Sequence, residues 1–255
     1  MPSEDVFEDE FFASLYDILN PWSVSDEFYV EQAVASGGPV LDLGCGTGTL
    51  ACSLAAKNLS VTGVDPAEAM LRIARSRVDG DKVSWIRSDG QSLRLAQRFK
   101  LIFMTGHAFQ SLLTDGDAVA LLRTAAHHLG AEGRFVFETR NPAAQAWLSW
   151  TPECSRRTVQ SSSCGRVLCF YDAQAGPGTG IVTIGEHFHL LDEGVQRVGR
   201  NRIRFVDPEH LANLLAQAGL VAIDWYGGWD RKPFCLTSEE IIVVTRQANQ
   251  TTSQI

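Results

Sequence analysis

The sequence predicts an α/β fold, in which a doubly wound, Rossmann-like parallel sheet carries an inserted antiparallel β-meander. Three observations predict it. Apolar runs of strand length alternate with helical patterns between residues 38 and 140, a glycine-rich turn follows the first run, and a period-two pattern occupies residues 155–205. Strand–helix alternation is typical of a parallel sheet covered by helices on both faces, and period-two runs between turn residues are typical of antiparallel hairpins.

An aromatic N-terminal segment precedes the alternating part. Residues 4–36 show two helical patterns, the first carried by Phe7, Phe11 and Leu15 and interrupted by Pro21. The alternating part then predicts strands at residues 40–43, 61–64, 83–86, 101–104 and 134–138, and helices at residues 47–57, 67–77 and 115–129. We expect the aromatic arm either to pack on the core of this unit or to close over a ligand.

The pattern changes after Asn141 and Pro142. Alternating side chains predict the meander, with turn signals at residues 176–180 and 192–194. Helical patterning returns at residues 208–218, and strands are predicted at residues 221–225 and 241–245. We therefore divide the chain into a helical arm or lid (1–36), a Rossmann-like core (37–140 and 206–247), an inserted meander (141–205) and a flexible polar tail (248–255).

The composition favours a small-molecule partner over a nucleic acid or a membrane. The chain has 255 residues and a formal net charge of −8, without the clustered basic residues that a nucleic-acid footprint requires. No run approaches the roughly 20 apolar residues of a membrane span, and the first residues lack a signal peptide's apolar run. The six cysteines include no CxxC pair, so we predict no metal site and expect a cytoplasmic protein with reduced thiols.

The glycine-rich turn carries the chemical signal of the sequence. It reads Asp42-Leu-Gly44-Cys45-Gly46-Thr-Gly48, follows a predicted strand and opens a helix. The glycines alternate, whereas the dinucleotide fingerprint needs its third glycine one residue later. Asp42 would repel a diphosphate and attract a cationic amino-acid moiety. The turn therefore favours a ligand of the second kind.

Two more acids stand at predicted strand ends. Asp65 ends the second strand, where a carboxylate suits hydrogen bonding to ribose hydroxyls. Asp89, within Ser88-Asp89-Gly90, follows the third strand and is placed to reach an adenine amino group. Together with the glycine turn, these positions predict a site for a nucleoside that carries an amino-acid group.

With these features in place, residues 40–51 resemble the first motif of class I S-adenosylmethionine-dependent methyltransferases of the small-molecule type. Residues 61–70 resemble their second motif, Asp89 their third, and residues 99–112 the strand and loop that follow. The resemblance implies a seven-stranded sheet with an antiparallel last strand, and S-adenosyl-L-methionine as cofactor. By the same resemblance, Asp42, Gly44 and Gly46 would hold the methionine moiety. Asp65 would hold the ribose, and Asp89 the adenine. The full set of implied cofactor contacts is Asp42, Gly44, Cys45, Gly46, Asp65, Pro66, Met70, Ser88, Asp89, Gly90, Thr105 and Gly106.

Acceptor residues are expected beyond the carboxyl ends of the strands. His107 either exchanges a proton with the acceptor or hydrogen-bonds within its own loop. Arg140 either pairs with an acidic substrate group or braces the insertion through a salt bridge. Glu186 shares a strand face with apolar side chains, so it points inward or is paired. These three are the predicted catalytic residues, and the predicted substrate-binding residues are Tyr16, Trp22, Phe109, Tyr226 and Trp229.

The resulting hypothesis is methyl transfer to an oxygen or nitrogen of a small acceptor, in secondary metabolism by family analogy. The segment after the fourth strand reads Met-Thr-Gly-His instead of Asn-Pro-Pro-Tyr, which disfavours methylation of adenine N6 or a glutamine amide. A non-catalytic cofactor-binding regulatory or interaction protein is the alternative. A nicotinamide-dependent oxidoreductase is disfavoured by the glycine spacing and Asp42. The meander is expected to act as a lid or as the surface of a homodimer.

Overall fold

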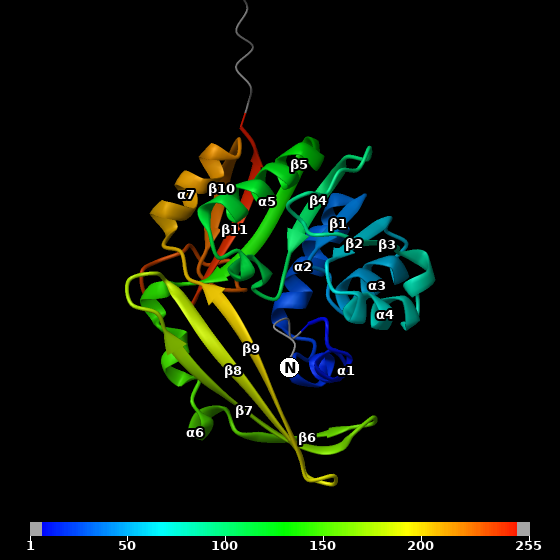
Figure 1. The fold of residues 1–255 in the computed structure, drawn as a ribbon. Helices are drawn as coiled ribbons and strands as arrows, with labels where there is room; N and C mark the ends of the chain where they lie inside the picture. Colours follow the sequence, from blue (N-terminus) through cyan, green and yellow to red (C-terminus); the bar gives the residue numbers. More distant parts are fainter. Residues whose placement is uncertain (1–6, 249–255) are drawn as a thin grey trace, which may run out of the picture.

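A computed structural model describes residues 7–248 of the chain, so most of the predicted tail lies outside the described residues. Its core is a seven-stranded sheet in the order β10-β11-β5-β4-β1-β2-β3 (Figure 1). The strands are β1 (Val40–Leu43), β2 (Val61–Asp65), β3 (Ser84–Arg87), β4 (Phe99–Met104), β5 (Leu129–Arg140), β10 (Leu220–Tyr226) and β11 (Glu240–Gln247). Only β11 runs antiparallel to its neighbours within this sheet. The predicted seven-stranded sheet with an antiparallel last strand is confirmed.

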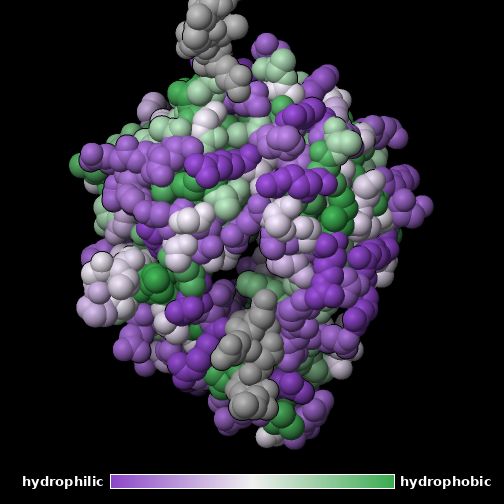
Figure 2. Space-filling view, turned by 45° about the horizontal axis from the view of Figure 1, so that its top comes forward, coloured by the Kyte–Doolittle hydropathy of each residue, from purple (hydrophilic) through white to green (hydrophobic). Residues whose placement is uncertain are grey.

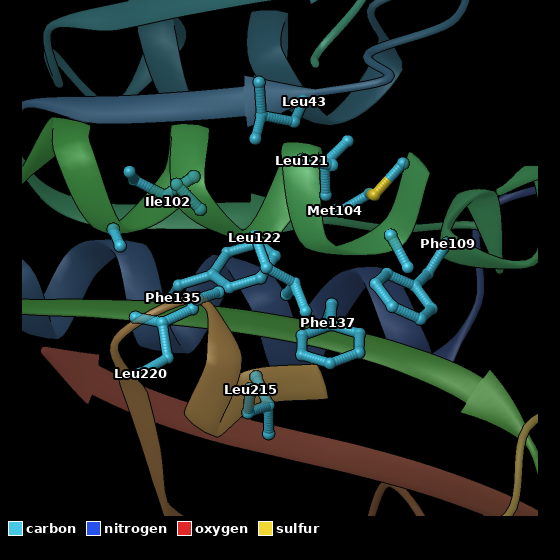
Figure 3. Packing of buried hydrophobic residues seen from close by; sticks show 14 of the residues in the cluster. Leu43, Ile102, Met104, Phe109, Leu121, Leu122, Phe135, Phe137, Leu215 and Leu220 are labelled. Atoms are coloured by element: carbon cyan, nitrogen blue, oxygen red, sulfur yellow. The ribbon is translucent and has the colours of Figure 1, made fainter. Parts of the chain in front are cut away.

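Helices cover both faces of the sheet, as the strand–helix alternation predicts. Side chains of α2 (Val24–Ser36) and α3 (Thr49–Ala56) share a hydrophobic cluster with one face. Side chains of α5 (Asp115–His128) and α7 (Pro208–Gln217) share a second cluster with the other face. Figure 3 shows Phe135 and Phe137 of β5 in this second cluster, between Leu122 and Leu215. The remaining core helices are α4 (Glu68–Ser76) and the short η1 (Gly80–Lys82) and η2 (Ala108–Ser111).

The predicted meander is confirmed as a separate four-stranded antiparallel sheet in the order β6-β7-β8-β9. It consists of β6 (Arg157–Ser161), β7 (Gly165–Ala175), β8 (Ile181–Leu190) and β9 (Val195–Arg204). The connection from β5 contains η3 (Pro142–Ala144), η4 (Ala146–Ser149) and α6 (Pro152–Ser155). In Figure 1 this sheet projects from the carboxyl-end side of β4 and β5.

The N-terminal helix α1 (Glu10–Leu19) lies between the two sheets. Its Leu15 packs against the four-stranded sheet in a cluster with Val167 and Phe188, while Ala13 packs against Met70 on α4. The aromatic arm therefore joins both parts of the molecule. Among residues 7–248, no helix has the length and apolar character that crossing a bilayer requires.

Two predicted boundaries are wrong for local reasons. The helix predicted from residue 47 begins at Thr49, because Gly48 before it has a left-handed φ of 76°. The strand predicted from residue 134 begins at Leu129, which pairs with Phe99 directly after α5 ends. β1 ends at Leu43 as predicted, and β5 ends at Arg140, two residues later than predicted.

The packing of β5 leads to a stability prediction. Phe137 is fully buried, and its ring lies 4.6 Å from that of Phe109 and 5.0 Å from that of Phe135. Phe137→Ala is expected to lower the free energy of unfolding by about 3–5 kcal/mol, because it removes apolar burial and leaves a cavity. Urea denaturation measures the change. Val78→Ala, at a side chain that is 86% exposed, is the control, and an equal effect of both substitutions would contradict the assigned core.

Candidate functional site

The glycine turn after β1 lies next to the carboxyl end of β2. Gly44 and Gly46 have φ values of 75° and 52°, in the region that favours glycine. The backbone N–H of Gly46 donates to Asp65 Oδ2 at 2.8 Å, and the N–H of Ala67 donates to Asp65 Oδ1 at 2.9 Å. Asp65 therefore holds the loops after β1 and β2 together.

Asp42 brings a second acid to the same place, beneath the turn. It is buried, and within residues 7–248 its Oδ1 has no hydrogen-bond partner. Burial, and to a lesser extent the negative charge of Asp65, raise the pKa of Asp42 well above its usual range. A cation bound nearby would relieve both effects. The turn thus fits a ligand with a positively charged group.

Two glycines, in the loops after β1 and β4, leave their backbone uncovered beside Tyr16. Among residues 7–248, a Cβ at Gly46 would meet only the ring of Tyr16, at 3.9 Å, and a Cβ at Gly106 would meet only its hydroxyl, at 3.5 Å. Gly106 follows Thr105 after β4, and its φ is 65°. Two bare backbone segments thus face the ring of Tyr16, with acids close by.

The remaining predicted cofactor residues lie around β2 and β3. Asp89 is exposed and accepts the backbone N–H of Ser92 at 2.6 Å, and hydrogen bonds from Ser92 lower the pKa of Asp89. Ser88 donates to the Asp89 carbonyl at 2.9 Å. A Cβ on Gly90 would lie 2.8 Å from Leu121, so packing against α5 explains this glycine. Pro66 is exposed, whereas Cys45 and Met70 are buried, Met70 beneath α1.

Helix α1 is fastened to the glycine turn by polar contacts. Asp17 accepts the hydroxyl of Thr47 at 2.5 Å and pairs with Arg77, whose Nε donates to the Thr47 carbonyl at 2.6 Å. The neighbouring Tyr16 lies over Gly46 and Gly106. Burial, with the nearby charge of Asp65, raises the pKa of Tyr16 to about 12, so its phenol stays protonated. Tyr16 is thus placed beside the predicted cofactor loops.

A buried polar network surrounds His107 in the loop after β4. His107 has a φ of 57°, and its backbone N–H donates to Glu138 Oε1 at 2.8 Å. The other oxygen of Glu138 accepts the hydroxyl of Tyr29 from α2. The Nε2 atom of His107 lies 2.9 Å from Glu240 Oε2 at the start of β11. The partners of the His107 backbone N–H and ring thus come from β5 and β11 and not from its own loop, and proton exchange with an acceptor stays a prediction.

Sequence reasoning missed three members of this network: Tyr29, Glu138 and Glu240. Burial raises the pKa of Glu138, the negative charge of Glu240 adds to the rise, and hydrogen bonds and the charge of His107 oppose it. One signal was present in the sequence. Glu138 ends the apolar run of β5, so it stands where an acid at a strand end points to a site.

Arg140 lies where β5 leads into the insertion. Its Nη1 donates to the Gln110 side chain at 2.8 Å, and its guanidinium stacks over Trp150 at 5.1 Å. It forms no ion pair with any described residue. The predicted salt bridge to the insertion is therefore wrong, because an aromatic ring holds the guanidinium there. Burial lowers the pKa of Arg140, and the charges of Glu240 and Glu138 oppose this shift.

Two of the predicted substrate-binding aromatics lie elsewhere. Phe109 is 2% exposed and belongs to the core beside α5, because η2 turns its ring inward. Trp22 lies near Cys52 and Arg77 in a surface hollow formed by α3 and the segment after α4, and its Nε1 donates to Glu27 at 2.6 Å. Phe109 thus lies in the loop after β4 with its ring in the core, and Trp22 lies in a hollow beside α3. Contact of either residue with a substrate stays a prediction.

Tyr226 and Trp229 form a wall against α2. Their rings lie 6.4 and 5.6 Å from that of Phe28, and Trp229 also lies 6.0 Å from Tyr29. These contacts are those of aromatic packing against α2, and contact of Tyr226 or Trp229 with a substrate stays a prediction. Through Tyr29 the wall reaches Glu138, so it shields the polar network around His107.

Glu186 is the predicted acid in the four-stranded sheet. On β8 it alternates with Ile184 and Phe188, on the face that packs toward α1 and the insertion's tryptophans. Burial raises its pKa to about 6. Figure 2 shows a hollow between the α/β core and the four-stranded sheet. The glycine loops, His107, Arg140 and Glu186 thus come from the elements that border the space between the two sheets.

Comparison with known proteins bears on this arrangement. Residues 40–133 match the family model of a methyltransferase domain. The putative methyltransferase YqeM of Bacillus subtilis (strain 168) is 28% identical over 134 residues, which cover 51% of this chain and 54% of that protein. The chain spans about half the length of the curated relatives it matches.

Solved structures resemble nearly the whole chain. The CcbJ methyltransferase from Streptomyces caelestis aligns with a TM-score of 0.77 at 23% identity, covering 97% of this chain and 100% of that one. CalS10 with bound S-adenosylmethionine, an amino pentose methyltransferase from Micromonospora echinaspora, aligns with a TM-score of 0.67 at 22% identity, covering 90% and 94%. At these identities the likeness concerns the fold alone, and it confirms the predicted α/β fold class. The inserted four-stranded sheet is part of the fold of this chain.

Proposed function

We propose that this chain, which belongs to the class I S-adenosylmethionine-dependent methyltransferase family, binds S-adenosylmethionine and methylates an oxygen or nitrogen of a small molecule. The acid pair at the glycine turn carries this proposal. Asp42 has an unpartnered buried oxygen within the described residues, and Asp65 joins the loops after β1 and β2. Both features suit a ligand with a cationic amino-acid end and a ribose.

The residues at the turn hold and orient such a ligand. Gly44, Gly46 and Gly106 offer backbone without side chains to the methionine moiety, and Asp65 accepts hydrogen bonds from the ribose hydroxyls. Asp89 is exposed two residues after β3, and it would contact the adenine ring. When bound, the cofactor supplies an electrophilic methyl group on a sulfonium. The protein then has to hold an acceptor in line with it.

Acceptor contacts come from the loops after β4 and β5 and from the inserted sheet. His107 receives the proton that an acceptor hydroxyl or amine releases, while Glu240 orients its ring. Arg140 and Glu186 supply opposite charges on two sides of the acceptor space. The fold of CalS10, an amino pentose methyltransferase involved in calicheamicin biosynthesis, supports a natural-product acceptor.

Two further assignments belong to this proposal. The six cysteines are all unpaired thiols in the structure, which suits the reducing cytoplasm. Helix α1 acts as the lid of the site, since it lies over Gly46 and Gly106 and is fastened by Asp17. The outer face of the inserted sheet is the surface by which two copies would associate as a homodimer.

Ligand titration tests the proposed function. Calorimetry is expected to detect binding of S-adenosylmethionine and of S-adenosylhomocysteine, and no binding of NAD. A screen of phenols, sugar hydroxyls and amines for release of S-adenosylhomocysteine then identifies the acceptor class. Binding of NAD without binding of S-adenosylmethionine would refute the proposal.

A further inference from the structure

Glu186 is an acid between two apolar clusters on the inner face of the four-stranded sheet. On one side, Phe188 packs with Leu15 and with the rings of Phe11 and Phe12, at 5.7 and 5.3 Å. On the other side, Ile184 joins a cluster that contains Trp150. Strand β8 is central in the sheet (Figure 1), so β7 and β9 also flank Glu186. This is an unusual position for a carboxylate that has no structural task.

No described residue neutralises this carboxylate. Other acids of the sheet are paired, Asp172 with His187 at 2.5 Å and Asp192 with Arg166 at 2.8 Å. Glu186 forms no hydrogen bond or ion pair within residues 7–248. Burial raises its pKa to about 6, so the carboxylate is ionised at neutral pH despite the cost of desolvation. Glu186 is half-buried. A partly desolvated charge without a partner costs the folded chain stability, and a bound cation would offset that cost.

The surroundings of Glu186 suit an organic cation. Tyr171 stands directly opposite it on β7, and Phe188 is the next side chain on its own face. The faces of aromatic rings attract ammonium groups, and a carboxylate provides the opposite charge and hydrogen-bond acceptors. A basic residue beside Tyr171, Arg157, donates to the Tyr171 hydroxyl at 3.5 Å and to the carbonyl of Leu19 at 3.1 Å, so it has other partners.

The position of Glu186 relates it to the acceptor and not to the cofactor. The cluster that contains Phe188 also contains Leu15 of α1, and the neighbouring Tyr16 lies over the glycine loops. The cluster that contains Ile184 also contains Trp150, and the guanidinium of Arg140 at the end of β5 stacks over Trp150. Glu186 therefore belongs to the wall of the space between the sheets that faces the carboxyl ends of β4 and β5.

We propose that Glu186, with Tyr171, forms a subsite for a protonated amino group of the acceptor. This inference rests on the proposed function and narrows it to acceptors that carry an amine. The ammonium group lies against the carboxylate of Glu186, beside the ring of Tyr171. Glu186 thereby selects amine-bearing acceptors over neutral analogues of the same shape.

Binding of a simple ammonium ion tests the subsite without knowledge of the acceptor. The protein is saturated with S-adenosylhomocysteine, and benzylammonium and its neutral counterpart benzyl alcohol are titrated by NMR. Benzylammonium is expected to bind at least about tenfold more tightly than benzyl alcohol, a difference of about 1.4 kcal/mol. Glu186→Gln is expected to abolish this preference, and Glu193→Gln, at an exposed acid in the β8–β9 turn, is expected to leave it unchanged.

Each result separates the two proposals. The subsite is refuted if benzylammonium does not bind, if benzyl alcohol binds equally well, or if Glu186→Gln leaves the preference intact. Binding of S-adenosylhomocysteine is recorded in the same samples, and its failure would refute the proposed function. In that case the ammonium titration on the unliganded protein still decides the subsite. The thermal midpoint of Glu186→Gln checks folding, and it is expected not to fall because the substitution removes a half-buried charge that has no partner among residues 7–248.

Discussion

Asp65→Ala is expected to weaken binding of S-adenosylhomocysteine by about 1–3 kcal/mol, or roughly 5- to 150-fold. The carboxylate acts in two ways. It would accept charge-assisted hydrogen bonds from the ribose, and it holds the backbone N–H groups of Gly46 and Ala67 at 2.8 and 2.9 Å. Its loss therefore removes ligand contacts and loosens the loops that shape the site. Calorimetry measures the affinity.

Two further variants separate these contributions. Asp65→Asn keeps the size of the side chain and one carbonyl acceptor, so it is expected to preserve more of the loop while losing the charge. Asp81→Ala removes an exposed acid near β3 and is expected to leave affinity unchanged. Native affinity in both Asp65 variants would place the ribose elsewhere. Thermal denaturation of each variant shows whether a lost affinity reflects a lost fold.

The cofactor half of the site was predictable because its signals are local in sequence. Asp42, Gly44 and Gly46 lie within five residues, and the spacing alone indicates a turn that leads from a strand into a helix. Asp65 required only the assumption that β2 lies beside β1, which parallel sheets with short connections satisfy. The fold followed from the same alternation of strands and helices.

The acceptor half depends on contacts between segments far apart in sequence. Tyr29, Glu138 and Glu240 meet because α2, β5 and β11 lie together, and no spacing in the sequence links them. Helical or strand periodicity also does not say which face of a short loop turns inward. Phe109 was predicted to face a substrate, and the left-handed φ of the residue before η2 turns its ring into the core.

The network around His107 makes that residue the strongest candidate for proton transfer. Glu138 fixes the backbone of its loop, and Glu240 lies 2.9 Å from Nε2. If Nε2 carries the proton and donates it to Glu240, Nδ1 has a free lone pair that can accept a proton from the acceptor. This arrangement resembles an acid–histidine pair in which the acid sets the tautomer. Substitutions of His107 and Glu240 test the assumption that His107 carries its proton on Nε2.

His107→Asn is expected to lower kcat by about 10²-fold or more and to leave the affinity for S-adenosylhomocysteine unchanged. Asparagine tolerates the left-handed φ of 57° better than alanine does, so the loop is retained while the base is lost. Glu240→Gln keeps the shape of the partner without its charge, and we expect a smaller loss of kcat than in His107→Asn. The acceptor found by the release screen serves as substrate. A near-native rate in His107→Asn would reduce His107 to a loop-forming residue, and methyl transfer would then rest on positioning alone.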